Sequence, residues 1–262
     1  MTGAESSPLG TVLLATTFSI AARCERTGLL GAAVSTAVPA VGALCTFVRA
    51  GAGAICTQSR VNPYLGIDGL TLLAAGWTAP EALEAVLRRD PLREVRQLGV
   101  VDAQGHGAVH TGSDCPAWAG HRAGSGYTVQ GNTLTGEGTI AAMAHAFEAD
   151  PGADLPERLL RALEAGQAAG GDRRGRQSAA LYVVGREEYP YLSLRVDAHA
   201  EPVAELRRIL EIARAQLLPL VETLPTRADP AGRIDPQVTA MLARPPADRG
   251  LPGPGPAQVD AS

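Results

Sequence analysis

The residue whose type and position best fit a catalytic role is Thr17. It begins a short segment in which side chains alternate, with Phe18, Ile20 and Ala22 on one face, as expected of a strand with one buried face. A threonine hydroxyl is a weak nucleophile at its own pKa, but a free α-amine on the same residue can act as its general base. Thr17 is equally consistent with a β-branched residue that simply starts a strand.

A second set of candidates consists of polar residues that can bind the substrate of such a nucleophile. Asn132 follows a short strand and a glycine; its amide can donate to an oxyanion, or the residue can occupy a turn. Asp172, Arg174 and Arg176 lie in a loop interrupted by glycine. There the arginines can clamp a carboxylate, or an ion pair can hold the loop.

Three more polar side chains can line the same pocket, although each also fits a scaffold role. They are Gln58, Asn62 and His121. The sequence contains no G-x-S-x-G or H-E-x-x-H motif and no cysteine pair with zinc-ligand spacing, so we expect neither a metal nor a cofactor.

Composition excludes several other classes of protein. All 23 basic residues are arginine, which excludes enzymes that need a lysine, such as those using pyridoxal phosphate or a Walker loop. The net charge of -4 and the 4% aromatic content argue against nucleic-acid binding. No apolar run is long enough to span a membrane. The four cysteines form no C-x-x-C pair, and we expect them to be thiols in a reducing cytoplasm.

The elements that must position these residues form alternating blocks. Short β-prone runs and helical stretches follow one another as strands, two helices, strands, two helices, strands and one helix. This order predicts a layered α+β fold with helices on both faces of largely antiparallel sheets. The expected helices begin near Asp68, Thr78, Gly136, Pro156 and Pro202; the expected strands cover 17–23, 29–36, 44–49, 54–58, 97–102, 108–111, 127–130, 178–184 and 191–196.

The two ends of the chain differ from the middle. Residues 1–16 are small and polar and then weakly apolar, so we interpret them as a leader, which cleavage before Thr17 would remove. Residues 17–221 carry the periodic segments and form the predicted domain. Residues 222–262 are rich in proline and glycine, which predicts a disordered tail.

Several stretches of the chain resemble a bacterial family of unknown function within the N-terminal-nucleophile (Ntn) hydrolase superfamily. The resemblance covers about residues 17–208. Its main stretches are Thr17-Phe-Ser-Ile-Ala-Ala-Arg, Pro39-Ala-Val-Gly-Ala, Arg49-Ala-Gly-Ala-Gly-Ala, Asn62-Pro-Tyr, Gly69-Leu-Thr-Leu-Leu-Ala-Ala-Gly, Gln97-Leu-Gly-Val-Val-Asp, Trp118-Ala-Gly-His, Val129-Gln-Gly-Asn, Asp172-Arg-Arg-Gly-Arg and Tyr189-Pro-Tyr-Leu-Ser-Leu-Arg-Val-Asp.

This resemblance implies a four-layer αββα sandwich and hydrolysis of an amide bond in a small molecule or peptide, with Thr17 as the leading threonine. Family members typically begin at that threonine, whereas sixteen residues precede it here. A free amine on Thr17 therefore requires cleavage of the Thr16-Thr17 bond. Exposure of Thr2 by loss of Met1 is a poor substitute, because no strand would position Thr2.

Two other interpretations remain open at this point. An unprocessed chain with the same fold can bind a small anionic metabolite through Arg174 and Arg176 without turnover. Alternatively, the alanine-rich helices can serve self-association in a structural subunit, and a homo-oligomer is compatible with either function.

Overall fold

The computed structural model describes residues 17–249. Two antiparallel sheets lie face to face at its centre. The six-stranded sheet has the order β10-β9-β2-β1-β8-β7, and the four-stranded sheet has the order β3-β4-β5-β6. The strands are β1 Thr17–Arg23, β2 Leu30–Thr36, β3 Thr46–Arg49, β4 Gly53–Ser59, β5 Arg96–Asp102, β6 Gly107–Thr111, β7 Gly120–Gly124, β8 Tyr127–Gly131, β9 Ser178–Val184 and β10 Pro190–Val196.

Small side chains line the interface between the sheets. Ala21 and Ala32 of the six-stranded sheet pack in one buried cluster with Ala54 and Cys56 of β4. At Gly99 in β5, a Cβ would lie only 2.0 Å from the Gln130 side-chain oxygen of β8. The alanines and glycines therefore let the two sheets approach closely.

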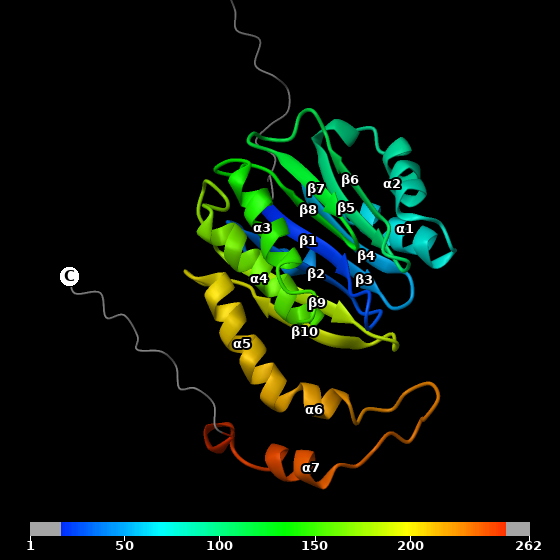
Figure 1. Ribbon diagram of the computed structural model, residues 1–262, viewed down its shortest axis with the longest axis vertical. Coiled ribbons are helices and arrows are strands. Elements are labelled where there is room, and N and C mark those ends of the chain that lie inside the picture. The colour runs from blue at the N-terminus through cyan, green and yellow to red at the C-terminus, as the bar shows by residue number, and fades with distance from the viewer. Residues whose placement is uncertain (1–16, 250–262) are drawn as a thin grey trace, which may run out of the picture. The chain divides into compact units, whose positions relative to one another are not determined.

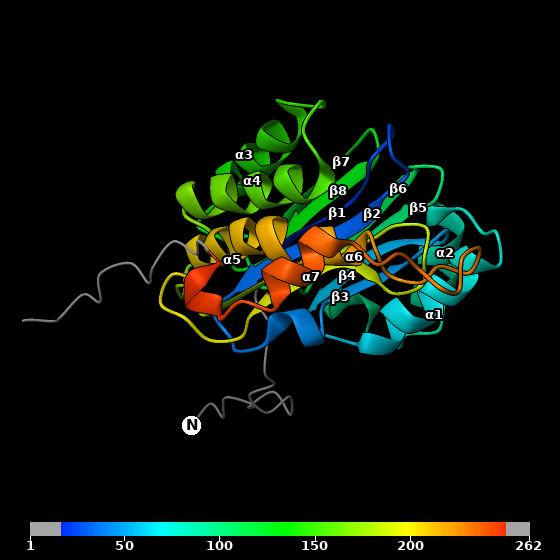
Figure 2. The same cartoon turned by 90° about the horizontal axis from the view of Figure 1, so that it is seen from below.

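Each sheet is covered on its outer face by a pair of helices (Figures 1 and 2). Helices α1 (Pro63–Ala74) and α2 (Ala79–Arg88) pack through leucines and alanines on the four-stranded sheet. Helices α3 (Gly138–Glu148) and α4 (Leu155–Ala168) cover the six-stranded sheet. The predicted αββα sandwich is thereby confirmed.

Of the two helices on the four-stranded sheet, α2 begins as the sequence predicts and α1 does not. Thr78 and Glu81 form the predicted capping box, in which the Thr78 N–H donates to Oε2 of Glu81 at 2.9 Å. Helix α1, however, begins at Pro63 and not at Asp68, because the Asn62 side chain accepts from the Tyr64 N–H at 3.1 Å. Proline is well placed at the first position of a helix.

The chain divides into two compact units, Met1–Arg207 and Arg208–Ser262. Helix α5 (Pro202–Gln216) runs across this division. It is followed by α6 (Leu218–Val221) and α7 (Pro236–Leu242), and single 3-10 turns occur at Val41–Ala43, Arg93–Val95 and Pro246–Asp248. None of the helices in residues 17–249 is long and apolar enough to cross a membrane.

The predicted leader and part of the predicted tail fall outside the described residues. These are residues 1–16 and 250–262. The described part of the predicted tail contains helix α7, which the sequence does not predict. Asp235 caps it by accepting from the N–H groups of Gln237 and Val238, as a helix N-cap should.

Candidate functional site

Thr17 is the first residue of β1 and lies in the middle of the six-stranded sheet, between β2 and β8. Its Oγ1 lies 3.3 Å from Oγ1 of Thr36 on β2. Its carbonyl oxygen accepts two hydrogen bonds, from the Asn132 N–H at 3.0 Å and from Gln58 Nε2 at 3.1 Å. Thr17 is buried, with an exposed fraction of 0%, and these two hydrogen bonds hold its carbonyl group in place.

A group of neutral polar side chains, here called the amide cluster, extends from Thr17 between the sheets. Its members are Ser19, Gln58, Gln97, Gln130 and Asn132, and each of them is fully buried. Gln58 and Gln97 come from β4 and β5 of one sheet, whereas Ser19 and Gln130 come from β1 and β8 of the other. The cluster therefore joins the two sheets through side-chain hydrogen bonds.

Gln97 is the centre of the amide cluster. Its Oε1 accepts from Gln58 Nε2 and from Asn132 Nδ2, both at 2.9 Å. Its Nε2 donates to the Gly131 carbonyl at 2.8 Å and to Thr111 Oγ1 at 2.9 Å. Both ends of the Gln97 side-chain amide are therefore hydrogen-bonded, which holds Gln97 in one orientation.

Ser19 continues the network on the other sheet. Its hydroxyl donates to Gln58 Oε1 and accepts from Gln130 Nε2, each at 2.6 Å. The members of the amide cluster carry no formal charge. The environment of the Thr17 backbone is therefore polar but neutral, which suits a reaction that begins and ends without a buried ion.

The turn after β8 combines backbone strain with unpartnered oxygens. Thr133 has a φ of 52°, a left-handed conformation that is unusual for a β-branched residue. The side-chain oxygens Asn132 Oδ1 and Thr133 Oγ1 are buried and have no hydrogen-bond partner within the described part of the chain. Strain and unpaired polar atoms cluster at functional sites, and here they lie beside Thr17.

The arginine loop, residues 172–176, borders this turn, and both of the arginines selected from the sequence already form ion pairs. The Arg173 N–H donates to the Thr133 carbonyl at 3.0 Å. Arg174 forms an ion pair with the buried Asp172 at 3.1 Å, and Arg176 forms one with Glu201. This arrangement favours the interpretation that the ion pairs hold the loop.

The two remaining candidates, Asn62 and His121, differ in whether hydrogen bonds connect them to the amide cluster. Asn62 caps α1 and donates through Nδ2 to Asp90 at 3.2 Å, so the structure gives it a scaffold role. His121 Nδ1 lies 2.8 Å from Thr111 Oγ1, which connects it to Gln97 and the amide cluster. Burial, assisted by the charge of His110, lowers the pKa of His121, which favours a neutral imidazole at pH 7.

Sequence reasoning missed Ser19, Thr36, Gln97 and Gln130 as parts of this site. The one available signal is a polar residue within an otherwise buried strand, as in Gln97 at the start of an apolar run. No three His, Cys, Asp or Glu side chains within residues 17–249 lie close enough to hold a metal ion. The four cysteines are buried free thiols, and burial raises the pKa of Cys56 to about 12.

Comparison with known proteins gives a family and a close fold relative. The model of the family described as "Family of unknown function (DUF1028)" matches residues 17–206. A crystal structure of a protein from Silicibacter pomeroyi, which carries the same family name, is 29% identical, with a TM-score of 0.76. The match covers 84% of this chain and 96% of that one. No curated protein matches this chain.

More distant structures include Anbu, an ancestral β-subunit, from two bacteria. Anbu from Yersinia bercovieri is 15% identical with a TM-score of 0.33, covering 80% of this chain and 98% of that one. A Gly-1 mutant of Anbu from Hyphomicrobium sp. strain MC1 is 14% identical with a TM-score of 0.38, covering 79% and 99%. The family match extends over most of the chain, which therefore belongs to DUF1028, a family of unknown function.

Proposed function

We propose that the protein is an amide hydrolase of the N-terminal-nucleophile type. Oγ1 of Thr17 is the nucleophile, and the α-amine released by cleavage of the Thr16-Thr17 bond is the general base. The observation that carries the proposal is the position of Thr17. It begins a central strand, and its carbonyl is held by two N–H donors beside a strained turn.

Cleavage comes first, because the nitrogen that serves as the general base is part of the Thr16-Thr17 peptide until that bond is broken. Thr17 Oγ1 attacks the Thr16 carbonyl carbon, and the peptide nitrogen leaves as the α-amine after taking the hydroxyl proton. The chain before Thr17 is then attached to Oγ1 as an ester. Water hydrolyses this ester, which releases residues 1–16 as a carboxylic acid and leaves a free hydroxyl and a free amine.

Catalysis repeats this chemistry on an external amide of a small molecule or peptide. The α-amine accepts the hydroxyl proton as Oγ1 attacks the substrate carbonyl, and it then passes that proton to the leaving amine. Water hydrolyses the resulting acyl ester. An α-amine has an ordinary pKa of about 8, so it can accept a proton near neutral pH in a protein that contains no lysine.

Asn132 has two roles in this proposal. Its backbone N–H holds the Thr17 carbonyl, and its Nδ2 uses one N–H to donate to Gln97. The second N–H of Nδ2 is available to an oxyanion formed beside Thr17. A donor held in place by a buried neighbour costs little reorganisation when negative charge develops.

Anion binding by an unprocessed chain through Arg174 and Arg176 has less support. Both guanidinium groups already form ion pairs, with Asp172 and Glu201. A ligand carboxylate would have to displace these partners, and breaking an ion pair offsets much of the gain from forming another.

The proposal is tested with a panel of N-acyl amino acids, ureido acids and isopeptides. We expect wild type to hydrolyse at least one of them and Thr17→Ala to be inactive, since no other group supplies the attacking oxygen. Thr71→Ala, a matched change at an exposed helix position, should keep full activity. Equal turnover by wild type and Thr17→Ala would refute the role of Thr17.

A second preparation separates processing from chemistry. A chain in which Thr17 directly follows the initiator methionine gains its free amine by removal of that methionine alone. If it is active whereas the full-length protein is uncut and inactive, the catalytic assignment stands and self-cleavage fails. If it is cut to Thr17 and inactive across the panel, the hydrolase proposal fails.

A further inference from the structure

A separate cavity lies at the opposite end of β1 from Thr17. It has a volume of about 690 Å³ and is bordered by the residues that follow β1, by the β5–β6 turn, by the β7–β8 turn and by the loop between α3 and α4. Since β1 has seven residues, its two ends are about 20 Å apart. The cavity is therefore not the substrate site of Thr17.

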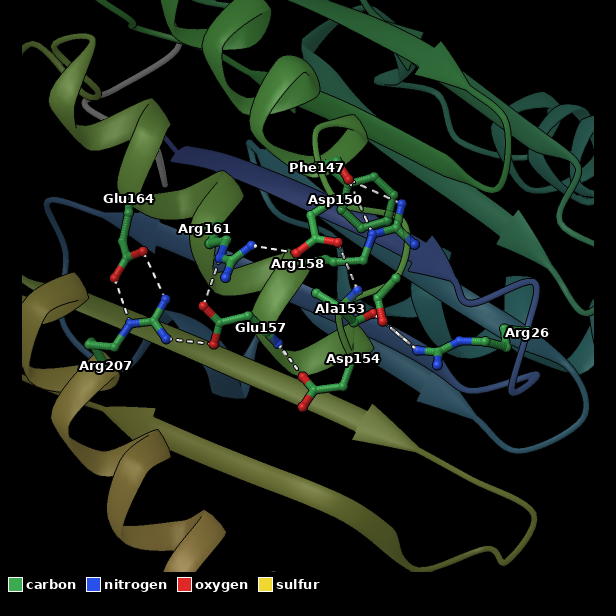
Figure 3. A network of polar contacts seen from close by, with 11 residues as sticks. Arg26, Phe147, Asp150, Ala153, Asp154, Glu157, Arg158, Arg161, Glu164 and Arg207 are labelled. Atoms are coloured by element: carbon green, nitrogen blue, oxygen red, sulfur yellow. Dashed lines mark hydrogen bonds and ion pairs between the residues drawn. The ribbon is translucent and has the colours of Figure 1, made fainter.

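Three arginines line this cavity, and their charges are not neutralised by ion pairs. Arg26 donates to the Gly152 carbonyl at 2.8 Å, and Arg158 donates to the Phe147 carbonyl at 3.1 Å, so both use neutral acceptors (Figure 3). Arg23 has neither an ion pair nor a side-chain hydrogen bond within residues 17–249. Three arginines without an ion pair in the described residues thus line one cavity.

The acidic groups nearby do not balance these charges. Glu148 lines the cavity, but it is engaged by Arg122 at 3.3 Å and by the Tyr127 hydroxyl. Asp150 is paired with Arg161 at 3.1 Å. Glu25 is the one other acidic residue of the lining. The three arginines carry three positive charges and Glu25 carries one negative charge, so the lining has a net positive charge of about two. This net charge matches a ligand with two negative charges.

Arg158 is fixed in a geometry that leaves one edge of its guanidinium for a ligand. Its Nε and Nη2 both donate to the Phe147 carbonyl, and its Cζ lies 3.9 Å from the centre of the Phe147 ring. Its Nη1 makes no hydrogen bond within the described part of the chain. A guanidinium that the Phe147 carbonyl already holds in place is organised for binding an oxyanion.

The pKa of Arg158 reflects its burial and the charges around it. Burial lowers the pKa of Arg158, and the charge of Arg26 acts in the same direction, while Cys24 and Asp150 oppose them. An anion placed between the arginines would relieve the repulsion between them.

We propose that this cavity binds a small dianionic metabolite, a phosphate monoester or a dicarboxylate, through Arg23, Arg26 and Arg158. Its volume lies within the range of small-molecule sites, and arginines are well suited to both kinds of oxyanion. This site is independent of the proposed hydrolase activity, because it requires neither Thr17 nor removal of residues 1–16.

The test is isothermal titration of the full-length protein with inorganic phosphate and, separately, with succinate, at constant ionic strength. We expect wild type to bind at least one of the two, and Arg23→Gln to weaken that binding about tenfold, as for loss of a charge-assisted hydrogen bond. The matched control is Arg88→Gln, whose side chain is 75% exposed on α2. It should bind like wild type.

The two anions distinguish the two classes of ligand, phosphate monoesters and dicarboxylates. Binding of phosphate alone assigns the site to phosphate monoesters, and binding of succinate alone assigns it to dicarboxylates. The Arg23 side chain makes no hydrogen bond or ion pair within residues 17–249, so circular dichroism should show Arg23→Gln folded like wild type. No binding of either anion at about 20 mM, or equal weakening by Arg23→Gln and Arg88→Gln, would overturn the proposal.

Discussion

The two ends of strand β1 offer opposite chemical environments. At Thr17 the strand is fully buried among neutral amides and hydroxyls. At Arg23 it opens on a cavity of about 690 Å³ that is lined by arginines. An unpaired charge at the Thr17 end would be costly to bury, whereas water can solvate the guanidinium groups at the open end. Burial thus determines which functional groups each end can hold.

The same contrast separates two kinds of function. At the closed end, the nucleophile that we propose gains its general base only when the Thr16-Thr17 bond is cut. At the open end, the ligand site that we propose requires no covalent change. Substitutions that remove buried polar partners and substitutions of solvent-exposed side chains should therefore differ in their effect on the free energy of unfolding.

The largest effect on stability is expected when the amide cluster loses its centre. Gln97→Leu removes the hydrogen bonds of Gln97 to Gln58, Asn132, Gly131 and Thr111, and it leaves Asn132 Nδ2 without its partner. A hydrogen bond contributes about 1 kcal/mol and an unsatisfied buried group costs about 1–3 kcal/mol, so the free energy of unfolding should fall by about 4 kcal/mol. Urea unfolding measures this change.

The control for that substitution comes from the open end of β1. Gln104 is an exposed glutamine in the lining of the arginine cavity, and Gln104→Leu should change the free energy of unfolding by less than about 0.5 kcal/mol. Equal losses for the two substitutions would contradict the contrast between a closed and an open end.

A smaller effect is expected at Asp102, which holds the β5–β6 turn beside the cavity. Its buried carboxylate accepts from the N–H groups of Ala79, Gln104 and His106 at 2.9–3.1 Å. Burial raises the pKa of Asp102, but these N–H groups and the His106 ring outweigh burial, and the net pKa is lowered. Asp102→Asn should lower the free energy of unfolding at pH 7 by about 2 kcal/mol.

The lowered pKa of Asp102 fixes the direction of its pH dependence. Its contribution is fully present above the unfolded pKa of about 3.9 and is lost as the pH falls through the lower folded pKa. Wild type should therefore lose more stability between pH 5 and about pH 2 than Asp102→Asn does. The exposed Asp68→Asn should follow wild type, and parallel curves for Asp102→Asn and wild type would disprove this assignment.

The smallest effect on stability is expected at the open end itself. Arg23→Gln removes a side chain that makes no ion pair within residues 17–249. It should change the free energy of unfolding by less than about 0.5 kcal/mol. A loss above about 1.5 kcal/mol in thermal or urea unfolding would show that Arg23 has a structural role.

Local patterns in the sequence predict the parts of the fold that depend on nearby residues. The alternation in Thr17–Arg23 and the capping box at Thr78 are confirmed, because each depends on residues that are close in sequence. Strand β7 (Gly120–Gly124) was missed, since it has a glycine at each end and mostly exposed side chains between them. Helix α7 was missed because prolines and glycines surround it.

The site was harder to predict than the fold. Ser19, Gln58, Gln97 and Gln130 come from four strands in two sheets, and only the packing of those sheets brings them together. Their spacing in the sequence has no period that indicates contact. Thr17 could be selected because its chemistry depends on its own backbone, whereas the amide cluster depends on the tertiary structure.

Cleavage before Thr17 is measured most directly by the intact mass, with N-terminal sequencing, of protein expressed without an N-terminal tag. The hydrolase proposal predicts a chain that begins at Thr17, with residues 1–16 released. The Thr17→Ala variant should keep these residues, since it has no hydroxyl to attack the preceding carbonyl. Wild-type protein that still carries residues 2–16 would contradict self-cleavage and leave Thr17 without its base.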